Sequence, residues 1–201
     1  MSPSTSARRP TALAIFLIVA GAIGFWAAFQ LTLDKLAVLA NPNAQLSCNF
    51  SLLVGCSKNL NSPQGAIFGF PNPLLGIAGW TAVIAVGAGI LAGGRFAKWY
   101  WMLFNLGVVG AIVLVGYLIT QSVTVLNVLC PWCMVTWVVT IPTFWAVTLY
   151  NLKEGNIPVP ASARRFFSTL YGWVPLITVA CYAIVAIWAQ LRLDWIHNVF
   201  V

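Results

Sequence analysis

Long apolar runs, separated by short groups of charged and turn-forming residues, form the dominant pattern of this chain. A helix needs about 20 apolar residues to cross the hydrocarbon core of a bilayer. Five charge-free runs meet this requirement and predict transmembrane helices over residues 11–33, 74–94, 99–121, 131–150 and 170–191. Proline sets two of the boundaries, because it breaks the interior of a helix but fits its first turn. Pro73 precedes the second span, and Pro131 begins the fourth.

These spans predict an all-α integral membrane protein in which a four-helix transmembrane bundle is followed by a fifth transmembrane helix. Residues 1–150 form the predicted four-helix domain, with a loop over residues 34–73 between its first two helices. Residues 151–169 contain charges and prolines, which predict a polar loop. Residues 170–201 carry the fifth helix and a short tail.

The composition agrees with a membrane protein. Hydrophobic residues make up 61% of the 201 residues and charged residues 6%, whereas soluble domains carry roughly 25% charged residues. The net charge of +7 comes from ten Lys and Arg residues that occur singly or in pairs. They form no basic stripe of the kind that binds nucleic acid, so we expect lipid as the surrounding medium and no nucleic-acid partner.

The positive charges predict the orientation, because Lys and Arg concentrate in the cytoplasmic segments of membrane proteins. With a cytoplasmic N-terminus, seven basic residues lie inside and three lie outside. The inner set is Arg8, Arg9, Arg95, Lys98, Lys153, Arg164 and Arg165, and the outer set is Lys35, Lys58 and Arg192. We therefore expect a multi-pass protein of the cell membrane, with the 34–73 loop on the outer side.

Four of the five cysteines fall on this outer side. Cys48 and Cys56 lie in the loop, where their spacing permits a disulfide without specifying one. Cys130 and Cys133 form a C-x-x-C motif at the start of the fourth helix. Pro131 suits the first helical position, which makes Cys130 the N-cap. Both sulfurs would then lie at the positive end of the helix dipole, which favours the thiolate that attacks disulfides and quinones.

Other interpretations of the cysteines stay open at this point. Four cysteines can hold zinc, although structural zinc sites usually combine two closely spaced pairs. Two structural disulfides are another alternative, although a bridge within one helical turn constrains the unfolded chain very little. Cys181 lies in the middle of the fifth span with no cysteine near it in sequence, and we expect it to be an inert apolar residue.

The predicted spans contain no Asp, Glu, Lys, Arg or His, whereas ion-coupled transporters usually carry such groups. Transfer of electrons through thiols needs no buried charge. It needs an apolar pocket in which a lipid-soluble acceptor meets a thiolate. Aromatic side chains are candidates for its wall, although each would equally suit a lipid-facing position. They are Phe68, Phe70, Trp80, Trp132 and Trp137.

The order of these motifs resembles the vitamin K epoxide reductase (VKOR) family, in its bacterial branch without a fused thioredoxin-like domain. The resemblance covers about residues 11–150. It rests on the loop cysteines, Ser62, the Phe68-Gly69-Phe70-Pro71-Asn72-Pro73 segment and the Cys130-Pro131-Trp132-Cys133 motif. It implies a four-helix bundle around a quinone of the menaquinone or ubiquinone type. The implied activity is a membrane thiol:quinone oxidoreductase that reoxidises a thioredoxin-like, DsbA-like disulfide-forming partner.

The resemblance also assigns roles to single residues. Cys48 exchanges with the partner, Cys56 passes electrons to Cys130, and Cys133 faces the quinone. Ser62 matches a Ser or Thr needed near the active cysteines.

Three residues are the expected quinone contacts. Asn72 matches a residue that hydrogen-bonds one quinone oxygen, and Phe68 is expected in the pocket wall. Trp137 stands where vertebrate members have a tyrosine, and its indole can donate a hydrogen bond but cannot accept one. No metal ligand is expected.

Three functional alternatives follow from the sequence. The chain ends ten residues after the predicted fifth helix, so in the favoured alternative the thiol oxidase is a separate extracytoplasmic protein. Reduction of vitamin K quinone or epoxide would use the same cysteines for another purpose. A non-enzymatic membrane scaffold, with structural disulfides or a zinc site, is the alternative from a different class.

Overall fold

The computed structural model describes residues 10–46, 48–51 and 53–196, and in this part of the chain the regular structure is helical. The elements are α1 (Thr11–Ala40), α2 (Ser57–Asn61), η1 (Pro63–Ala66), α3 (Asn72–Leu91), α4 (Lys98–Gln121), η2 (Ser122–Leu126), α5 (Pro131–Glu154), α6 (Ala161–Tyr171) and α7 (Val174–Leu193). Five helical segments are long and apolar enough to cross a membrane: α1, α3, α4 with its π-helical extension η2, α5 and α7. The predicted all-α class with five spans is confirmed.

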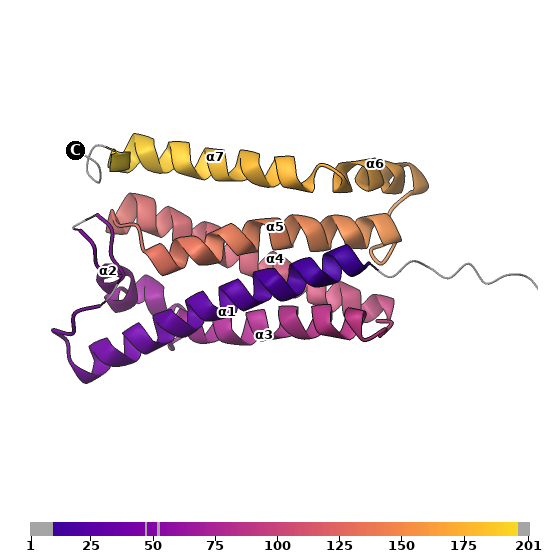
Figure 1. Ribbon diagram of the computed structural model, residues 1–201. Coiled ribbons are helices and arrows are strands. Elements are labelled where there is room, and N and C mark those ends of the chain that lie inside the picture. The colour runs from indigo at the N-terminus through magenta and orange to yellow at the C-terminus, as the bar shows by residue number, and fades with distance from the viewer. Residues whose placement is uncertain (1–9, 47, 52, 197–201) are drawn as a thin grey trace, which may run out of the picture.

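The long helices lie side by side as a bundle, with α7 beside α5 (Figure 1). Helix α1 packs against α3 and α5, and α4 packs against α5. The core contains Leu17, Val86, Trp101 and Val147, with Trp80 between α1 and α3. Small residues allow membrane helices to approach closely. A side chain at Gly24 of α1 would overlap the Trp80 indole, so this close contact requires glycine.

The first helix is longer than the sequence predicted. It ends at Ala40 rather than at residue 33, so the connection to α3 covers residues 41–71 instead of 34–73. The charged pair Asp34 and Lys35 suggested the end of the span, but both residues are helical. Lys35 donates through Nζ to the Leu60 carbonyl at 2.7 Å. The helix thus presents its polar residues to the connecting segment instead of stopping at them.

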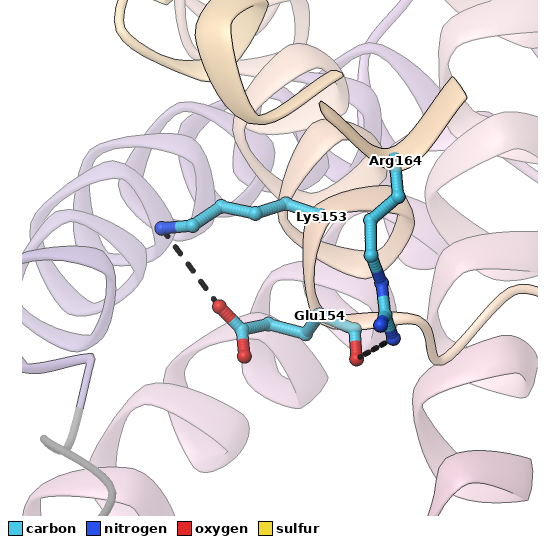
Figure 2. Close-up of polar contacts among 3 residues, drawn as sticks. All are labelled: Lys153, Glu154 and Arg164. Carbon is cyan, nitrogen blue, oxygen red and sulfur yellow. Dashed lines mark hydrogen bonds and ion pairs between the residues drawn. The ribbon is translucent and has the colours of Figure 1, made fainter. Parts of the chain in front are cut away.

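The predicted polar loop over residues 151–169 is largely helical, which corrects the sequence interpretation. Helix α5 continues to Glu154 and ends at Gly155, whose φ of 72° is left-handed. Helix α6 then begins after Pro160 and packs against α5. Arg164 of α6 donates to the Glu154 carbonyl at 3.0 Å, and Lys153 lies 3.8 Å from the Glu154 carboxylate (Figure 2). These contacts fasten α6 to the end of α5.

The two ends of the bundle differ in structure. At one end, residues 41–71 with α2 form what we call the cap, next to the end of α1 and the starts of α3 and α5 (Figure 1). Helix α6 lies at the other end. The described basic residues near α6 and the α3–α4 turn are Arg95, Lys98, Lys153, Arg164 and Arg165, and those at the cap end are Lys35, Lys58 and Arg192. Arg8 and Arg9, which also entered the orientation argument, lie outside the described residues.

Candidate redox site

The four cysteines predicted to act together meet at the cap end of the bundle. Cys48 and Cys56 are joined in a disulfide with a Cα–Cα distance of 5.8 Å, and Cys130 and Cys133 are thiols. The sulfurs of Cys56 and Cys130 lie only 3.4 Å apart. Cys48, Cys56 and Cys130 are at most 2% exposed. The sulfurs of Cys48, Cys56 and Cys130 therefore form one buried series, and Cys133 follows as a partly buried thiol.

A short parallel β-bridge between Val54 and Leu129 brings the two pairs together. Leu129 donates its N–H to the Leu53 carbonyl at 2.8 Å, and Gly55 donates to the Leu129 carbonyl at 3.0 Å. The bridge joins the residues just before Cys56 to the residue just before Cys130. Sequence reasoning missed it, because a bridge this short leaves no periodic pattern.

Asn49 holds the chain between the two loop cysteines in a compact turn. Its Oδ1 accepts hydrogen bonds from the N–H groups of Cys56 at 2.9 Å and Ser57 at 3.3 Å, and its Nδ2 donates to Ser57 Oγ at 2.7 Å. Asparagine side chains commonly close turns in this way. The sequence signal was therefore an asparagine directly after Cys48, although that signal does not name its partners.

The start of α5 has the predicted geometry. Cys130 is the N-cap, Pro131 is the first helical residue, and the Cys130 sulfur accepts a hydrogen bond from the Cys133 N–H at 3.4 Å. Cys133 is partly buried on the first turn. It packs both with the cluster around Cys56 and with a second apolar cluster around Trp137. Cys133 therefore lies where the cap meets the membrane-spanning part of the bundle.

Ser62 lies within the cap and bonds to backbone groups. Its hydroxyl donates to the Asn59 carbonyl at 2.8 Å and accepts from the Gly65 N–H at 3.2 Å. It thereby joins α2 to η1. Two contacts of neighbouring residues, Ser122 Oγ with Asn59 Oδ1 and Gln64 Nε2 with Gln121 Oε1, tie the cap to the end of α4.

The residues predicted to contact a quinone occupy different surroundings. Trp137 is buried one turn after Cys133, against side chains of α4 and α7 that include Ile119 and Leu193. Phe68 is 61% exposed and stacks on Phe70 with 6.3 Å between the ring centroids. The structure thus brings Trp137 and Cys133 into one cluster, whereas Phe68 lies on the surface of the protein.

Asn72, the third predicted contact, connects α3 to η1. It donates through Nδ2 to the Gln64 carbonyl at 2.7 Å and accepts from the Ile67 N–H at 3.1 Å. An amide has two donor hydrogens and two acceptor lone pairs. These two contacts leave one of each, which is enough for one further polar partner.

Asp34 is a further residue of the site that the sequence did not single out. Its Oδ2 lies 3.3 Å from the sulfur of Cys48. The ligand-type atoms of Asp34, Cys48 and Cys56 all lie within 4.8 Å of one another, and in the described part of the chain no other three such residues meet this closely. Zinc binds thiolates, whereas two of these three residues share a disulfide. The arrangement therefore fits redox chemistry at Cys48 better than it fits a structural zinc ion.

Comparison with known proteins gave one match. The model of the vitamin K epoxide reductase family matches residues 15–148 of this 201-residue chain. No curated protein and no solved structure matches it. The matched region runs from α1 into α5 and includes the four cysteines of the site and the cap.

Proposed function

The chain belongs to the vitamin K epoxide reductase family of membrane thiol:quinone oxidoreductases, and from this premise we propose that it reoxidises a separate thioredoxin-like thiol oxidase outside the cytoplasm. The electrons pass through Cys48 and Cys56 to Cys130 and Cys133, and then to a quinone of the menaquinone or ubiquinone type. The favoured substrate on the outer side is the reduced dithiol of a DsbA-like protein.

The 3.4 Å distance between the sulfurs of Cys56 and Cys130 carries this proposal. Thiol–disulfide exchange requires the attacking sulfur to reach a sulfur of the disulfide, through a mixed-disulfide intermediate. A disulfide bond is about 2.05 Å long, so a small movement of the cap is enough for bonding. Two purely structural disulfides would have no need for this contact between the pairs.

The surroundings of Cys133 support a quinone as the final acceptor. Cys133 packs against an apolar cluster that contains Trp137 and residues of α4 and α7. The indole N–H and the remaining N–H of Asn72 are candidate donors to the quinone oxygens. Phe68 is a candidate for the wall that faces the lipid, from which an isoprenoid quinone would enter.

An open depression of about 310 Å³ lies in the segment of the cap that contains Cys48. Its lining residues are Pro42, Asn43, Ala44, Gln45, Leu46 and Asn49. We infer that the thioredoxin-like partner rests here. Because Cys48 is only 2% exposed, the partner's thiolate reaches this sulfur after a local displacement of the cap.

The direct test mixes the purified protein with dithiothreitol and a short-chain soluble quinone and follows the quinone absorbance. We expect quinone reduction that depends on both the protein and the dithiol. Vitamin K epoxide, supplied in place of the quinone, tests the alternative activity. A protein that leaves the quinone oxidised and instead holds stoichiometric zinc on elemental analysis would refute the proposal in favour of a scaffold.

The orientation is tested with a membrane-impermeant maleimide. After mild reduction of intact cells, we expect the reagent to label Cys48 or Cys56, because the positive charges favour an outer cap. As the control, a cysteine introduced by Ser162→Cys, on the exposed surface of α6, should react only after lysis. The reverse pattern would overturn the orientation.

The quinone contact of Asn72 is tested by Asn72→Ala. Loss of one hydrogen bond costs about 0.5–1.5 kcal/mol, so the quinone concentration for half-maximal rate should rise by up to about tenfold. Gln64→Ala is the matched control, because it loosens the cap at Gln121 but keeps the backbone carbonyl that Asn72 contacts. If both variants change the quinone dependence equally, Asn72 acts only by holding the cap.

A further inference from the structure

Asp34 is one of only three acidic residues in the whole chain, together with Glu154 and Asp194. It sits on α1 below the cap, and its Oδ2 lies 3.3 Å from the Cys48 sulfur. Among the described residues, this sulfur is the only polar contact of the Asp34 side chain, which has no ion-pair partner within 4.0 Å. The neighbouring ammonium of Lys35 is bound to the Leu60 carbonyl instead.

This contact gives Asp34 no evident stabilising role while Cys48 is oxidised. The sulfur of a disulfide carries no hydrogen, so it donates no hydrogen bond to the carboxylate. Partial removal of a carboxylate from water without a compensating partner is unfavourable. The same 3.3 Å separation is a hydrogen bond once Cys48 becomes a thiol.

We propose that Asp34 is the proton acceptor and donor of Cys48 during disulfide exchange. The inference rests on the proposed function for the direction of electron flow. Asp34 touches the reacting sulfur itself, and its oxygen also lies within 4.8 Å of Cys56. It is therefore placed to move a proton at the cysteine that both receives the partner's electrons and closes the catalytic cycle.

In the closing step, the loop and membrane pairs are linked by a Cys56–Cys130 disulfide. The Cys48 thiol gives its proton to the Asp34 carboxylate, and the resulting thiolate attacks the Cys56 sulfur. The Cys48–Cys56 bond forms and the Cys56–Cys130 bond breaks, with its electron pair leaving on Cys130. Asp34 then releases the proton to water.

In the opening step the proton moves in the opposite direction. One sulfur of the partner's dithiol has already attacked Cys48 and forms a mixed disulfide with it. The second sulfur of the dithiol now attacks the first. The electron pair of the broken bond leaves on Cys48, which takes a proton from Asp34, and water supplies that proton. The dithiol is oxidised to a disulfide, and Cys48 is reduced to a thiol.

The effect of removing the carboxylate on the rate of the closing step should depend on pH in a characteristic way. An ordinary thiol is only a few per cent ionised at neutral pH, so without Asp34 the closing step depends on that small fraction. Asp34→Asn should therefore accumulate the Cys56–Cys130 bridge at pH 7 and resolve it about tenfold more slowly than the wild type. At pH 9, where hydroxide ionises Cys48, the two proteins should converge.

Other groups near the site are unchanged in this comparison. They are Lys35 on α1, Lys58 on α2, and the thiols of Cys56, Cys130 and Cys133 at the cap and at the start of α5. A difference in pH profile between the wild type and Asp34→Asn therefore reports on the carboxylate.

The experiment starts from fully reduced protein in detergent. One equivalent of a soluble quinone is added, the reaction is quenched with acid at set times, free thiols are alkylated, and the disulfides are identified by peptide mass spectrometry. Asp34→Glu, which keeps a carboxylate, should restore most of the wild-type rate. Glu154→Gln changes the same charge at the far end of the bundle and should behave as the wild type.

Two results would overturn the inference. One is wild-type resolution of the bridge in Asp34→Asn at pH 7, and the other is a slowing that is equal at pH 7 and pH 9, which indicates a structural role. A parallel series with diamide, a general thiol oxidant, keeps the test independent of the quinone. If the reduced wild type forms disulfides with diamide but not with quinone, the result would count against the proposed function and leave the Asp34 comparison intact.

Discussion

Cys133→Ser should abolish quinone reduction, whereas Cys181→Ala should keep the wild-type rate. Cys133 lies on the first turn of α5 and packs toward the Trp137 cluster, while its neighbour Cys130 contacts Cys56. In this arrangement Cys133 is the thiol of the membrane pair that is available to react with the quinone. Removal of an essential nucleophile typically lowers the rate by about 10³-fold or more.

A spectroscopic signature accompanies this loss. A thiolate held against a quinone at the N-terminus of α5 should form a coloured charge-transfer complex. Cys133→Ser should remove the absorbance band, and Cys181→Ala should keep it, because Cys181 lies on α7 as a partly buried thiol. Full turnover in Cys133→Ser, or loss of turnover in Cys181→Ala with the other cysteines intact, would contradict the assignment.

The features that the sequence predicted well are those fixed by local physics. Runs of apolar residues gave the five spans, because a bilayer sets both the composition and the length of a helix. The Cys130-Pro131-Trp132-Cys133 motif gave the start of α5, since proline at the first helical position makes the preceding residue the N-cap. Neither prediction depends on contacts with distant segments of the chain.

The features that the sequence did not predict depend on contacts between distant segments. Asp34 and Lys35 suggested a loop, yet α1 continues through both residues, and the Leu60 carbonyl of the cap accepts a hydrogen bond from Lys35. The Val54–Leu129 bridge likewise joins residues from different connections. Helix α6 is short and follows prolines and charged residues, and these residues predicted a loop where the structure has a helix.

The same reasoning explains the mixed placement of the predicted quinone contacts. Trp137 follows Cys133 by one helical turn, and helix geometry alone puts the two side chains on one face. Phe68 and Asn72 lie at the end of the cap, where hydrogen bonds between Asn72, Gln64 and Ile67 decide the conformation. The quinone roles of all three residues stay predictions.

Cys48→Ala should trap the link between the two cysteine pairs as a Cys56–Cys130 disulfide. In the proposed cycle, Cys48 is the thiol that releases Cys56 from Cys130. Without it, only a return attack of Cys133 on Cys130, which reverses the step, can open the bridge between the two pairs. The two sulfurs already lie 3.4 Å apart, so bond formation needs a closure of roughly 1.3 Å. We expect the bridge to become the major species after addition of quinone to the reduced variant.

Peptide mapping under non-reducing conditions detects this bridge directly. Unlike the bridge expected in Asp34→Asn, it should persist at pH 9, because alkaline pH cannot supply the missing thiol. Cys56→Ala is the matched control, since it removes the sulfur that contacts Cys130 and should leave Cys130 free to pair with Cys133. A Cys48–Cys130 bridge in Cys56→Ala, formed as readily as the Cys56–Cys130 bridge in Cys48→Ala, would show that the loop cysteines are interchangeable. The ordered path from Cys48 through Cys56 would then be wrong, although the membrane pair would keep its role toward the quinone.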